Sequence, residues 1–373
     1  NRALNGDKVK VLLLPGRHGK KPEGQVVEIV KRVKEQFVGT LQVTRYYSFL
    51  IPDNQSIPVD IYIPNDKIKG AQNGDKVVVK IVDWPENSKN PFGEVLSVLG
   101  KPGDNNVEMQ SIIAEFGFPL HFPQNVERDA ENIDIKIKQE EINKRRDFRE
   151  TFTITIDPED AKDFDDAVSL CKLTNGNWEV GVHIADVSHY VKENSIIDQE
   201  AYERGTSIYL ADRVVPMLPE VLSNNVCSLR PKEDKLCFSA VFEMTDKAEI
   251  VGEWVGKTII NSNHRFNYEE VQSTIVNEQG LYAEEILTLN RLASLLREER
   301  FKSGSFDFDT EEVRFKYDEK GKPIEVYIKQ QKESNKLIED FMLLANRRVA
   351  ELIVKTQNNK PPKTFVYRIH DKP

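Results

Sequence analysis

Six carboxylates fall within ten residues of the sequence, inside the stretch TFTITIDPEDAKDFDDAVSL at positions 151–170. They are Asp157, Glu159, Asp160, Asp163, Asp165 and Asp166. Carboxylates held this close together repel one another and raise one another's pKa values. A hard divalent cation, which prefers oxygen ligands, would offset that repulsion. The stretch is therefore the first candidate for a catalytic or metal-binding site.

The flanking residues indicate that these acids lie in a loop between two strands of a folded core. Phe152, Ile154 and Ile156 alternate with two threonines, a pattern that predicts a half-buried strand. An apolar run resumes at Ala167 and predicts the next strand.

Other interpretations of the acids remain open at this point. An acidic loop can simply be solvated. The pair Asp163-Phe164-Asp165 is also typical of metal-dependent transferases that bind a nucleotide sugar. A calcium loop of the EF-hand type does not fit, because Ala161 or Ala167 takes the fifth ligand position.

The elements that must position the acids follow in order. Residues 167–173 and 178–185 predict a hairpin, because Asn175-Gly176 is a strong turn signal between them. His183 on the second strand is either a ligand or a packed core histidine. Asp186 either approaches the acids or caps the following turn. A helix expected over 335–355 carries Glu339 near its start. There the carboxylate is either a capping group stabilised by the helix dipole or a residue that faces an active site.

An internal repeat organises the N-terminal part. Asn5-Gly6-Asp7-Lys8-Val9 recurs 68 residues later as Asn73-Gly74-Asp75-Lys76-Val77. A period near that length is the size of one small β-barrel, and the short alternating strands favour an OB-like or cold-shock barrel. Tyr46, Tyr47, Phe49 and Trp84 either stack on RNA bases or fill the barrel. We expect residues 1–36 to be the C-terminal part of a first barrel, 37–100 a second barrel, and 101–144 a connector.

Composition narrows the class of protein. Hydrophobic residues make up 39% of the chain and no apolar run is long enough to span a membrane, so we expect a soluble protein with no membrane partner. Three cysteines without CxxC spacing favour a reducing compartment, and we predict a cytoplasmic location. The net charge is −9, but residues 1–36 hold nine basic and four acidic residues, a balance of +5 that suits a phosphate-binding surface. No obligatory protein partner is evident.

Six separated motifs resemble one family. In order they are ITIDPEDAKDFDDAVSL, HIADVSHYV, YERGTSIYLADRVVPMLP, LSNNVCSL, KLIEDFMLLANRRVAE and YRIHDKP. Together they are similar to the catalytic (RNB) domain of the ribonuclease II/ribonuclease R family, with the ribonuclease R branch the better match. The resemblance covers about residues 145–373. It implies a multidomain protein in which OB/cold-shock-like barrels precede an α+β RNB domain, here expected to be incomplete at its C-terminus.

The resemblance also assigns residues. It implies that Asp157, Asp163, Asp165 and Asp166 bind catalytic magnesium, with manganese as a substitute, and we expect Asp165 to lie nearest the attacking water. It places the nucleotide-clamping tyrosine at Tyr209, a second channel tyrosine at Tyr268, the stacking phenylalanine at Phe308 or the nearby Phe306, and a helix carboxylate at Glu339. Tyr46 and Phe49 are the barrel residues that we expect to bind RNA.

The activity that the resemblance implies is processive 3′–5′ hydrolysis of single-stranded RNA to nucleoside 5′-monophosphates by a two-metal mechanism. The family's catalytic domain continues past HDKP into a stretch that bears an arginine, and then into an S1 barrel. We therefore expect a fragment that binds metal with weak or no turnover. An inactive RNA-binding scaffold on the same fold is the alternative.

Overall fold

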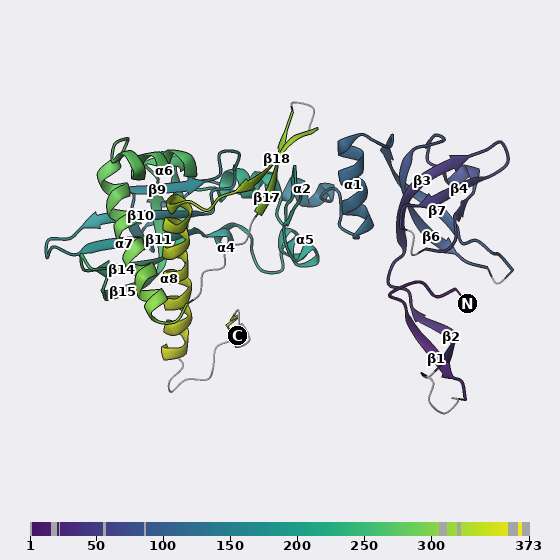
Figure 1. Ribbon diagram of the computed structural model, residues 1–373, viewed down its shortest axis with the longest axis horizontal. Helices are drawn as coiled ribbons and strands as arrows, with labels where there is room; N and C mark the ends of the chain where they lie inside the picture. The colour runs from purple at the N-terminus through teal and green to yellow at the C-terminus, as the bar shows by residue number, and fades with distance from the viewer. Residues whose placement is uncertain are drawn as a thin grey trace. The chain divides into compact units, whose positions relative to one another are not determined.

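The structure is a computed structural model that describes residues 2–15, 21, 23–54, 57–85, 87–305, 312–318, 322–356 and 365–367 (Figure 1). The chain forms two compact units. The N-terminal unit comprises Asn1–Phe122, Tyr209–Val215 and Tyr317–Ile324, and the C-terminal unit comprises the rest. The described residues include no helix that is long and apolar enough to cross a membrane.

The N-terminal unit contains a closed five-stranded barrel with the strand order β3-β4-β5-β7-β6. The strands are β3 (Gln36–Val43), β4 (Ser48–Pro52), β5 (Ile61–Ile63), β6 (Lys76–Asp83) and β7 (Phe92–Gly100), with the short helix η1 (Asn65–Lys67) after β5. Alternate residues point inward, so Phe37, Leu41, Val77 and Val79 form a core that is at most 1% exposed. This is the predicted OB/cold-shock barrel.

The hairpin ahead of the barrel repeats the structure of its last two strands. β1 (Lys8–Leu13) pairs with β2 (Gly24–Lys31) so that Val9 faces Ile29. In the barrel, β6 pairs with β7 so that Val77 faces Val98, and each of these partners lies 68 or 69 residues after its counterpart. Both hairpins have a register shift just before the valine and another two residues later.

The turn before each hairpin is repeated as well. Asp7 accepts a hydrogen bond from the backbone N–H of Leu4, and Asp75 accepts the same bond from Gln72. Asp7 pairs with Arg32 at 3.3 Å, and Asp75 pairs with Lys101 at 2.7 Å. The sequence repeat is thus a repeat of structure, which supports the prediction that residues 1–36 belong to a barrel of their own; the domain boundaries stay a prediction.

Three helices form the connector. α1 (Asn105–Glu115) begins at Asp104, whose side chain accepts from two backbone N–H groups of the first turn, and it packs on the barrel. α2 (Gln124–Glu131) and α3 (Gln139–Ile142) follow in the C-terminal unit.

The C-terminal unit is built on a seven-stranded mixed sheet in the order β16-β9-β10-β11-β14-β15-β8. The strands are β8 (Arg146–Phe148), β9 (Thr153–Asp157), β10 (Asp166–Lys172), β11 (Trp178–Ala185), β14 (Asp234–Met244), β15 (Ile250–Asn261) and β16 (His264–Asn267). β8 and β16 run parallel to their neighbours, and the other pairs are antiparallel. The predicted hairpin at 167–185 is therefore confirmed as β10 and β11.

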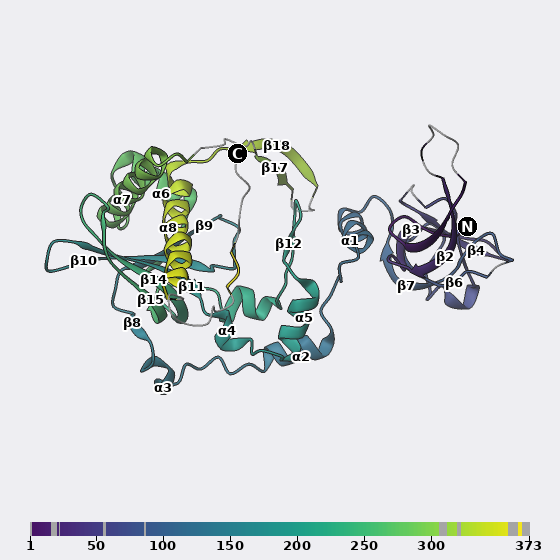
Figure 2. The ribbon, with the colours of Figure 1, turned by 90° about the horizontal axis from the view of Figure 1, so that it is seen from below.

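Three helices lie together on one side of this sheet in both views (Figures 1 and 2). They are α6 (Tyr268–Asn277), α7 (Ala283–Lys302) and α8 (Glu333–Thr356). Their apolar residues, such as Val271, Leu289 and Phe341, share one core with Val168 and Val182 of the sheet. The helix predicted at 335–355 is confirmed as α8.

The remaining elements connect these layers. They are α4 (Val187–Tyr190), α5 (Ile196–Arg204), the two-stranded β12 (Ile208–Tyr209) and β13 (Val214–Val215), the π-helical turn η2 (Leu222–Val226), and the hairpin of β17 (Glu312–Tyr317) and β18 (Pro323–Lys329).

One local prediction is wrong. The alternation around Ile154 and Ile156 predicted a half-buried strand, but all residues of β9 are buried, with Thr153 and Thr155 fully inaccessible. Ile154 and Ile156 pack in the core that the sheet shares with the helices, and the opposite, polar face of β9 is inaccessible as well.

Candidate active site

Two strand ends bring the acids together. Asp157 is the last residue of β9 and Asp166 is the first residue of β10, and these strands are antiparallel neighbours in the sheet. The intervening loop carries the other acids. Its end is fixed where the backbone N–H of Ala185 donates to the Asp165 carbonyl at 3.0 Å. The predicted placement of the acids in a loop between two core strands is confirmed.

The two strand-end carboxylates are under electrostatic strain. Asp157 is 7% exposed, and burial together with the charge of Asp165 raises its pKa to about 6. Burial and the charges of Asp165 and Asp157 raise the pKa of Asp166 to about 7. One oxygen of each, Oδ2, is buried and has no hydrogen-bond partner. Such orphaned acceptors are costly unless something positive binds them.

The other acids lie nearer to solvent. Asp163 and Asp165 are both exposed residues. Burial, followed by the charge of Asp163, raises the pKa of Asp165. Glu159 and Asp160 are exposed as well and lie outside the four-aspartate pattern.

The donor set fits a hard divalent cation. Among the described residues, no three His, Cys, Asp or Glu side chains are drawn together closely enough to form a finished metal site. The carboxylates of Asp157, Asp165 and Asp166 nevertheless act on one another's pKa values, and two orphaned buried oxygens remain free to act as ligands. All-oxygen, carboxylate-rich sets of this kind suit magnesium.

The loop is anchored by a residue that sequence reasoning missed. The Ser228 hydroxyl accepts from the backbone N–H of Phe164 at 3.1 Å and donates to the carbonyl of Lys162 at 2.9 Å. The N–H of Leu229 donates to the carbonyl of Phe164 at 2.7 Å. Ser228 belongs to the motif LSNNVCSL, so the motif was noticed, but nothing in the sequence connects it to a loop more than 60 residues away.

Tyr268 lies close enough to the acids for their charges to act on its hydroxyl, and its channel role stays a prediction. It is the first residue of α6, where Asn267 caps the helix and forms a capping box with Glu270. Burial, followed by the charges of Asp166 and Asp157, raises the pKa of Tyr268 to about 12. Its hydroxyl is therefore a neutral hydrogen-bond donor near the carboxylates at physiological pH.

The structure does not test three other predicted site residues. Tyr209 ends β12, is 71% exposed and is grouped with the N-terminal unit. Glu339 is exposed on α8, and it is the other loop acids that act on the pKa values of Asp157 and Asp166. Phe308 and its alternative Phe306 lie outside the described residues. The roles of all of them stay predictions.

The helix-dipole explanation for Glu339 is wrong. α8 begins at Glu333, so Glu339 lies beyond its first turn, where the dipole acts most strongly. The neighbouring Asp340 is the buried acid of this helix, and it pairs with Arg297 and Arg300 at 3.3 and 3.0 Å.

His183 is a packed core residue. It is fully buried, and its two ring nitrogens lie 2.7 Å from the Ser239 hydroxyl and 2.9 Å from the Ser169 hydroxyl. Phe148 packs edge-on against the ring at 5.0 Å. Gly181 is required beside it, because a Cβ there would come within 2.6 Å of His183 Nε2. The metal-ligand alternative for His183 finds no support in these contacts.

Asp186 neither joins the acid loop nor caps α4 with its side chain. It forms a buried ion pair with Arg145 at 2.7 Å and accepts a hydrogen bond from the Ser188 hydroxyl. Arg145 also donates to the carbonyls of Cys237 and Thr258. The pair fixes the end of the connector against the edge of the sheet.

A row of side chains on the sheet continues from the acids. Asp166, Ile184, Phe238 and Lys257 are successive cross-strand partners on β10, β11, β14 and β15, and we call them the open rung. They share a sheet face with the next row, which includes Val168 and lies in the helix-covered core. Ile184 and Phe238 are nevertheless 43% and 46% exposed. The open rung thus provides an accessible apolar surface beside a candidate metal ligand.

The barrel carries an aromatic row of its own. Tyr47, Phe49, Tyr62 and Phe92 follow one another edge-on, with ring centroids 5.6, 5.5 and 5.1 Å apart. Tyr46 is 76% exposed, and the guanidinium of Arg45 lies 5.6 Å from its ring. The alternative that these aromatics fill the barrel is wrong for Tyr46 and Tyr47, because both are exposed.

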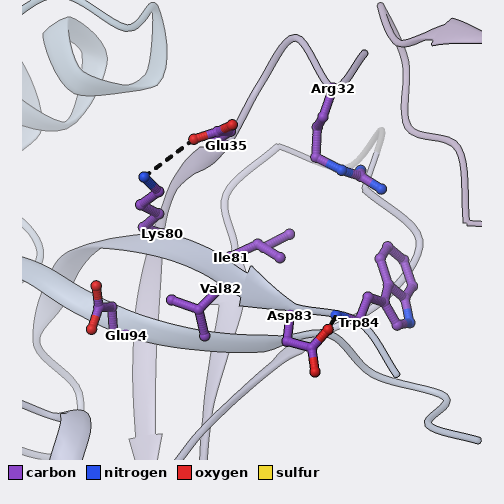
Figure 3. Close-up of a pocket in the computed structure, with 8 residues that line it drawn as sticks. All are labelled: Arg32, Glu35, Lys80, Ile81, Val82, Asp83, Trp84 and Glu94. Carbon is purple, nitrogen blue, oxygen red and sulfur yellow. Dashed lines mark hydrogen bonds and ion pairs between the residues drawn. The ribbon is translucent and has the colours of Figure 1, made fainter. Parts of the chain in front are cut away.

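A hollow in the N-terminal unit is lined in part by Trp84, the fourth of the predicted stacking aromatics (Figure 3). Its lining includes Arg32 and Trp84, whose ring lies 5.8 Å from the guanidinium. The lining also holds one lysine and three carboxylates: Lys80, Glu35, Asp83 and Glu94. Two cations against three anions leave this hollow with little attraction for a phosphate, so we assign it no substrate.

Comparisons with known proteins agree with these observations. The RNB domain matches residues 145–373, and a cold shock domain matches residues 49–123. Ribonuclease R of Thermotoga maritima is 38% identical over the whole chain, which covers 52% of that protein. The chain therefore spans about half the length of this curated relative.

Two solved structures place the fold. Mycoplasma genitalium RNase R in complex with ribose-methylated single-stranded RNA superposes with a TM-score of 0.87 at 28% identity, covering 95% of this chain and 57% of that one. Yeast Ssd1, a pseudonuclease, superposes with a TM-score of 0.66 at 19% identity, covering 95% of this chain and 50% of that one, and shows likeness of fold alone. A cold-shock barrel followed by an RNB domain with a strand-end acid loop identifies the chain as a member of the RNB family of ribonuclease II and ribonuclease R.

Proposed function

We propose that this chain is the RNA-binding and metal-binding part of a magnesium-dependent 3′–5′ exoribonuclease that hydrolyses single-stranded RNA to nucleoside 5′-monophosphates. The observation that carries the proposal is the loop from Asp157 to Asp166, with two buried, unpartnered carboxylate oxygens in an RNB domain. The RNA in the Mycoplasma genitalium complex supports the choice of substrate. An RNA substrate is also compatible with the predicted cytoplasmic location.

The four aspartates have distinct roles in this proposal. Asp157, Asp163, Asp165 and Asp166 would hold magnesium, with manganese as a substitute. When bound, a pair of such ions neutralises the phosphodiester and stabilises the attacking and leaving oxygens of an in-line displacement. Asp165 is exposed at the loop's end, so it is the acid that we assign to the attacking water.

The surrounding side chains would orient the RNA. The neutral hydroxyl of Tyr268 can donate to the substrate next to the acids. The apolar part of the open rung, Ile184 and Phe238, can contact the base or ribose of the nucleotide being released. Tyr209 and Phe308 keep their proposed role as stacking residues for the 3′ end, and Glu339 keeps its proposed role as an active-site carboxylate.

The barrel would hold RNA that has not yet reached the site. Tyr46 and Phe49 belong to an aromatic surface on which successive bases can stack without sequence preference. Holding upstream RNA while the 3′ end is degraded is the physical basis of the processivity that we propose. Preference for RNA over DNA would come from contacts to the 2′-hydroxyl.

One experiment tests the proposal. The chain is incubated with a 5′-labelled single-stranded RNA in magnesium or in EDTA, beside the Asp165→Asn variant. We expect RNA retention in both proteins and weak, magnesium-dependent shortening from the 3′ end in the wild type only. Robust degradation would contradict the prediction of weak turnover. If Asp165→Asn changed neither hydrolysis nor binding, the chain would be a scaffold.

A further inference from the structure

Arg265 is a basic side chain that contacts the acid loop and to which sequence reasoning assigned no role. It lies on β16, which runs parallel to β9 so that Arg265 pairs with Thr155 and Asn267 pairs with Asp157. Its side chain therefore starts beside the strand that delivers the first acid of the loop.

The guanidinium of Arg265 contacts the acid loop near its start, at Pro158 and Glu159, and near its end, at Phe164. Its Nη2 donates to the carbonyl of Pro158 and, at 2.9 Å, to the carbonyl of Glu159, the two residues directly after Asp157. The same guanidinium lies 5.3 Å from the ring of Phe164, which separates Asp163 from Asp165. One planar group thus connects the residues that follow the first acid to the residue between two later ones.

We propose that Arg265 is a positioning residue that sets the spacing of the loop carboxylates for divalent cation binding, an inference that rests on the function proposed above. Arginine suits this role because one guanidinium nitrogen donates to two carbonyls while the planar face of the group lies against a ring. A lysine would keep the charge and could still donate to a carbonyl, but it would lose the planar face that contacts Phe164. Arg265 would not itself touch the cation.

The positive charge of Arg265 and its contacts with the loop have opposite expected effects on metal affinity, so the two can be tested separately. A cation beside Asp157 repels a second cation, so removing the charge alone would strengthen metal binding. Removing the contacts of Arg265 with Pro158, Glu159 and Phe164, which we call the clamp, would weaken metal binding because the loop carboxylates would no longer be held at a fixed spacing. Loss of supporting contacts around metal ligands typically lowers affinity by about 10–100-fold.

The test measures manganese binding by the loss of the free-ion signal in electron paramagnetic resonance, on the whole chain without RNA. The variants are Arg265→Met and Arg265→Lys. Arg291→Lys is the matched control, because Arg291 also binds a backbone carbonyl and a carboxylate, both from Asp246. We expect both Arg265 variants to weaken manganese binding by about 10-fold or more and the control to match the wild type.

Three outcomes would overturn the proposal that Arg265 positions the loop carboxylates. Tighter binding by Arg265→Met with unchanged binding by Arg265→Lys would mean that Arg265 acts through charge alone. Equal binding by all variants would mean that it has no role. No binding by the wild type would overturn the proposed metal site and the clamp with it.

Two further readouts separate positioning from general damage to the fold. Thermal unfolding checks each variant, and Phe164→Leu removes the ring contact without touching the carbonyl bonds, so it serves if Arg265→Met does not fold. RNA retention in EDTA should stay within about twofold of the wild type, since the barrel surface is unchanged. Weaker manganese binding with normal RNA retention is the signature of a positioning residue.

Discussion

Asp157 and Asp166 end and begin neighbouring strands, and each holds a buried carboxylate oxygen that accepts no hydrogen bond. The pair is therefore a source of instability in the metal-free chain and a source of affinity for a cation. Sites that strain the fold in order to bind are expected where function requires them.

Asp166→Asn should abolish magnesium-dependent hydrolysis yet stabilise the metal-free chain. Because folding raises the pKa of Asp166 to about 7, its favourable contribution is present below about pH 4 and is lost as the pH rises through 7. At pH 8 the variant should gain about 1–3 kcal/mol in free energy of unfolding, measured by urea titration in EDTA. The gain should shrink at pH 5. Asp160→Asn, on an exposed acid, should change little.

Phe238→Ser should weaken productive RNA binding through the open rung. Phe238 is 46% exposed on the row that begins at Asp166, so its loss removes contact area without emptying the core. We expect KM to rise by about fivefold or more, in line with the loss of one stacked base. Tyr202→Ser, on the exposed face of α5, is the control. An unchanged KM in Phe238→Ser would remove the open rung from the site.

His183 should make the fold sensitive to acid. Burial, followed by the charge of Arg146, lowers the pKa of His183 to about 3 from its usual 6.5, so the folded chain keeps the ring neutral. The stabilising effect is complete above pH 6.5 and is lost as the pH falls from 6.5 towards 3, by about 1.4 kcal/mol per unit. The stability difference between the wild type and His183→Gln should therefore narrow between pH 6 and pH 5. A constant difference would contradict the neutral buried ring.

Arg145→Met should destabilise the C-terminal unit strongly. The Arg145 side chain is fully buried and that of Asp186 is 2% exposed, so the variant leaves a carboxylate without its main partner in the interior. Loss of one member of a buried pair costs about 3–5 kcal/mol. The double variant Arg145→Met/Asp186→Asn should recover part of that loss. A loss below about 1 kcal/mol in the single variant would show that Lys257, 3.6 Å from Asp186, compensates.

Phe49→Ala should lower RNA affinity without affecting metal binding. Phe49 is the centre of the aromatic row on the barrel, with Tyr47 and Tyr62 packed against it. Loss of one stacking surface should weaken binding of single-stranded RNA by about 1–3 kcal/mol, measured by filter retention in EDTA. Val82→Ala, an exposed apolar residue of β6, is the control.

The sequence predicted what local signals encode. The acid loop and the hairpin at 167–185 were predicted because their signals are local. These signals are the alternation of apolar and polar residues along a strand and the Asn-Gly turn, each contained within a few neighbouring residues. Ser228 and Arg265 were missed because their partners lie more than 60 residues away along the chain. The two buried faces of β9 were missed because burial of a strand depends on what packs above and below the sheet, which its own residues do not encode.

The start of α8 shows the same limit. A helix was expected from about residue 335 and begins at Glu333, which places Glu339 still further beyond the first turn, where the dipole acts most strongly. The family resemblance added residue roles that no local pattern contains. Those of Tyr209, Phe308 and Glu339 still depend on it alone.

The repeated hairpins bear on how such barrels fold. β1–β2 keeps the register of β6–β7 and the first two of its three shifts, although Val79 is inaccessible in a closed core and its counterpart Val11 is 46% exposed. The register is thus maintained by the turn and the irregular pairs rather than by the burial of one face. A hairpin that defines its own alignment can form early, through contacts close in sequence, and then template the strands that close around it. Folding of the closed barrel would then begin at its C-terminal hairpin, β6–β7.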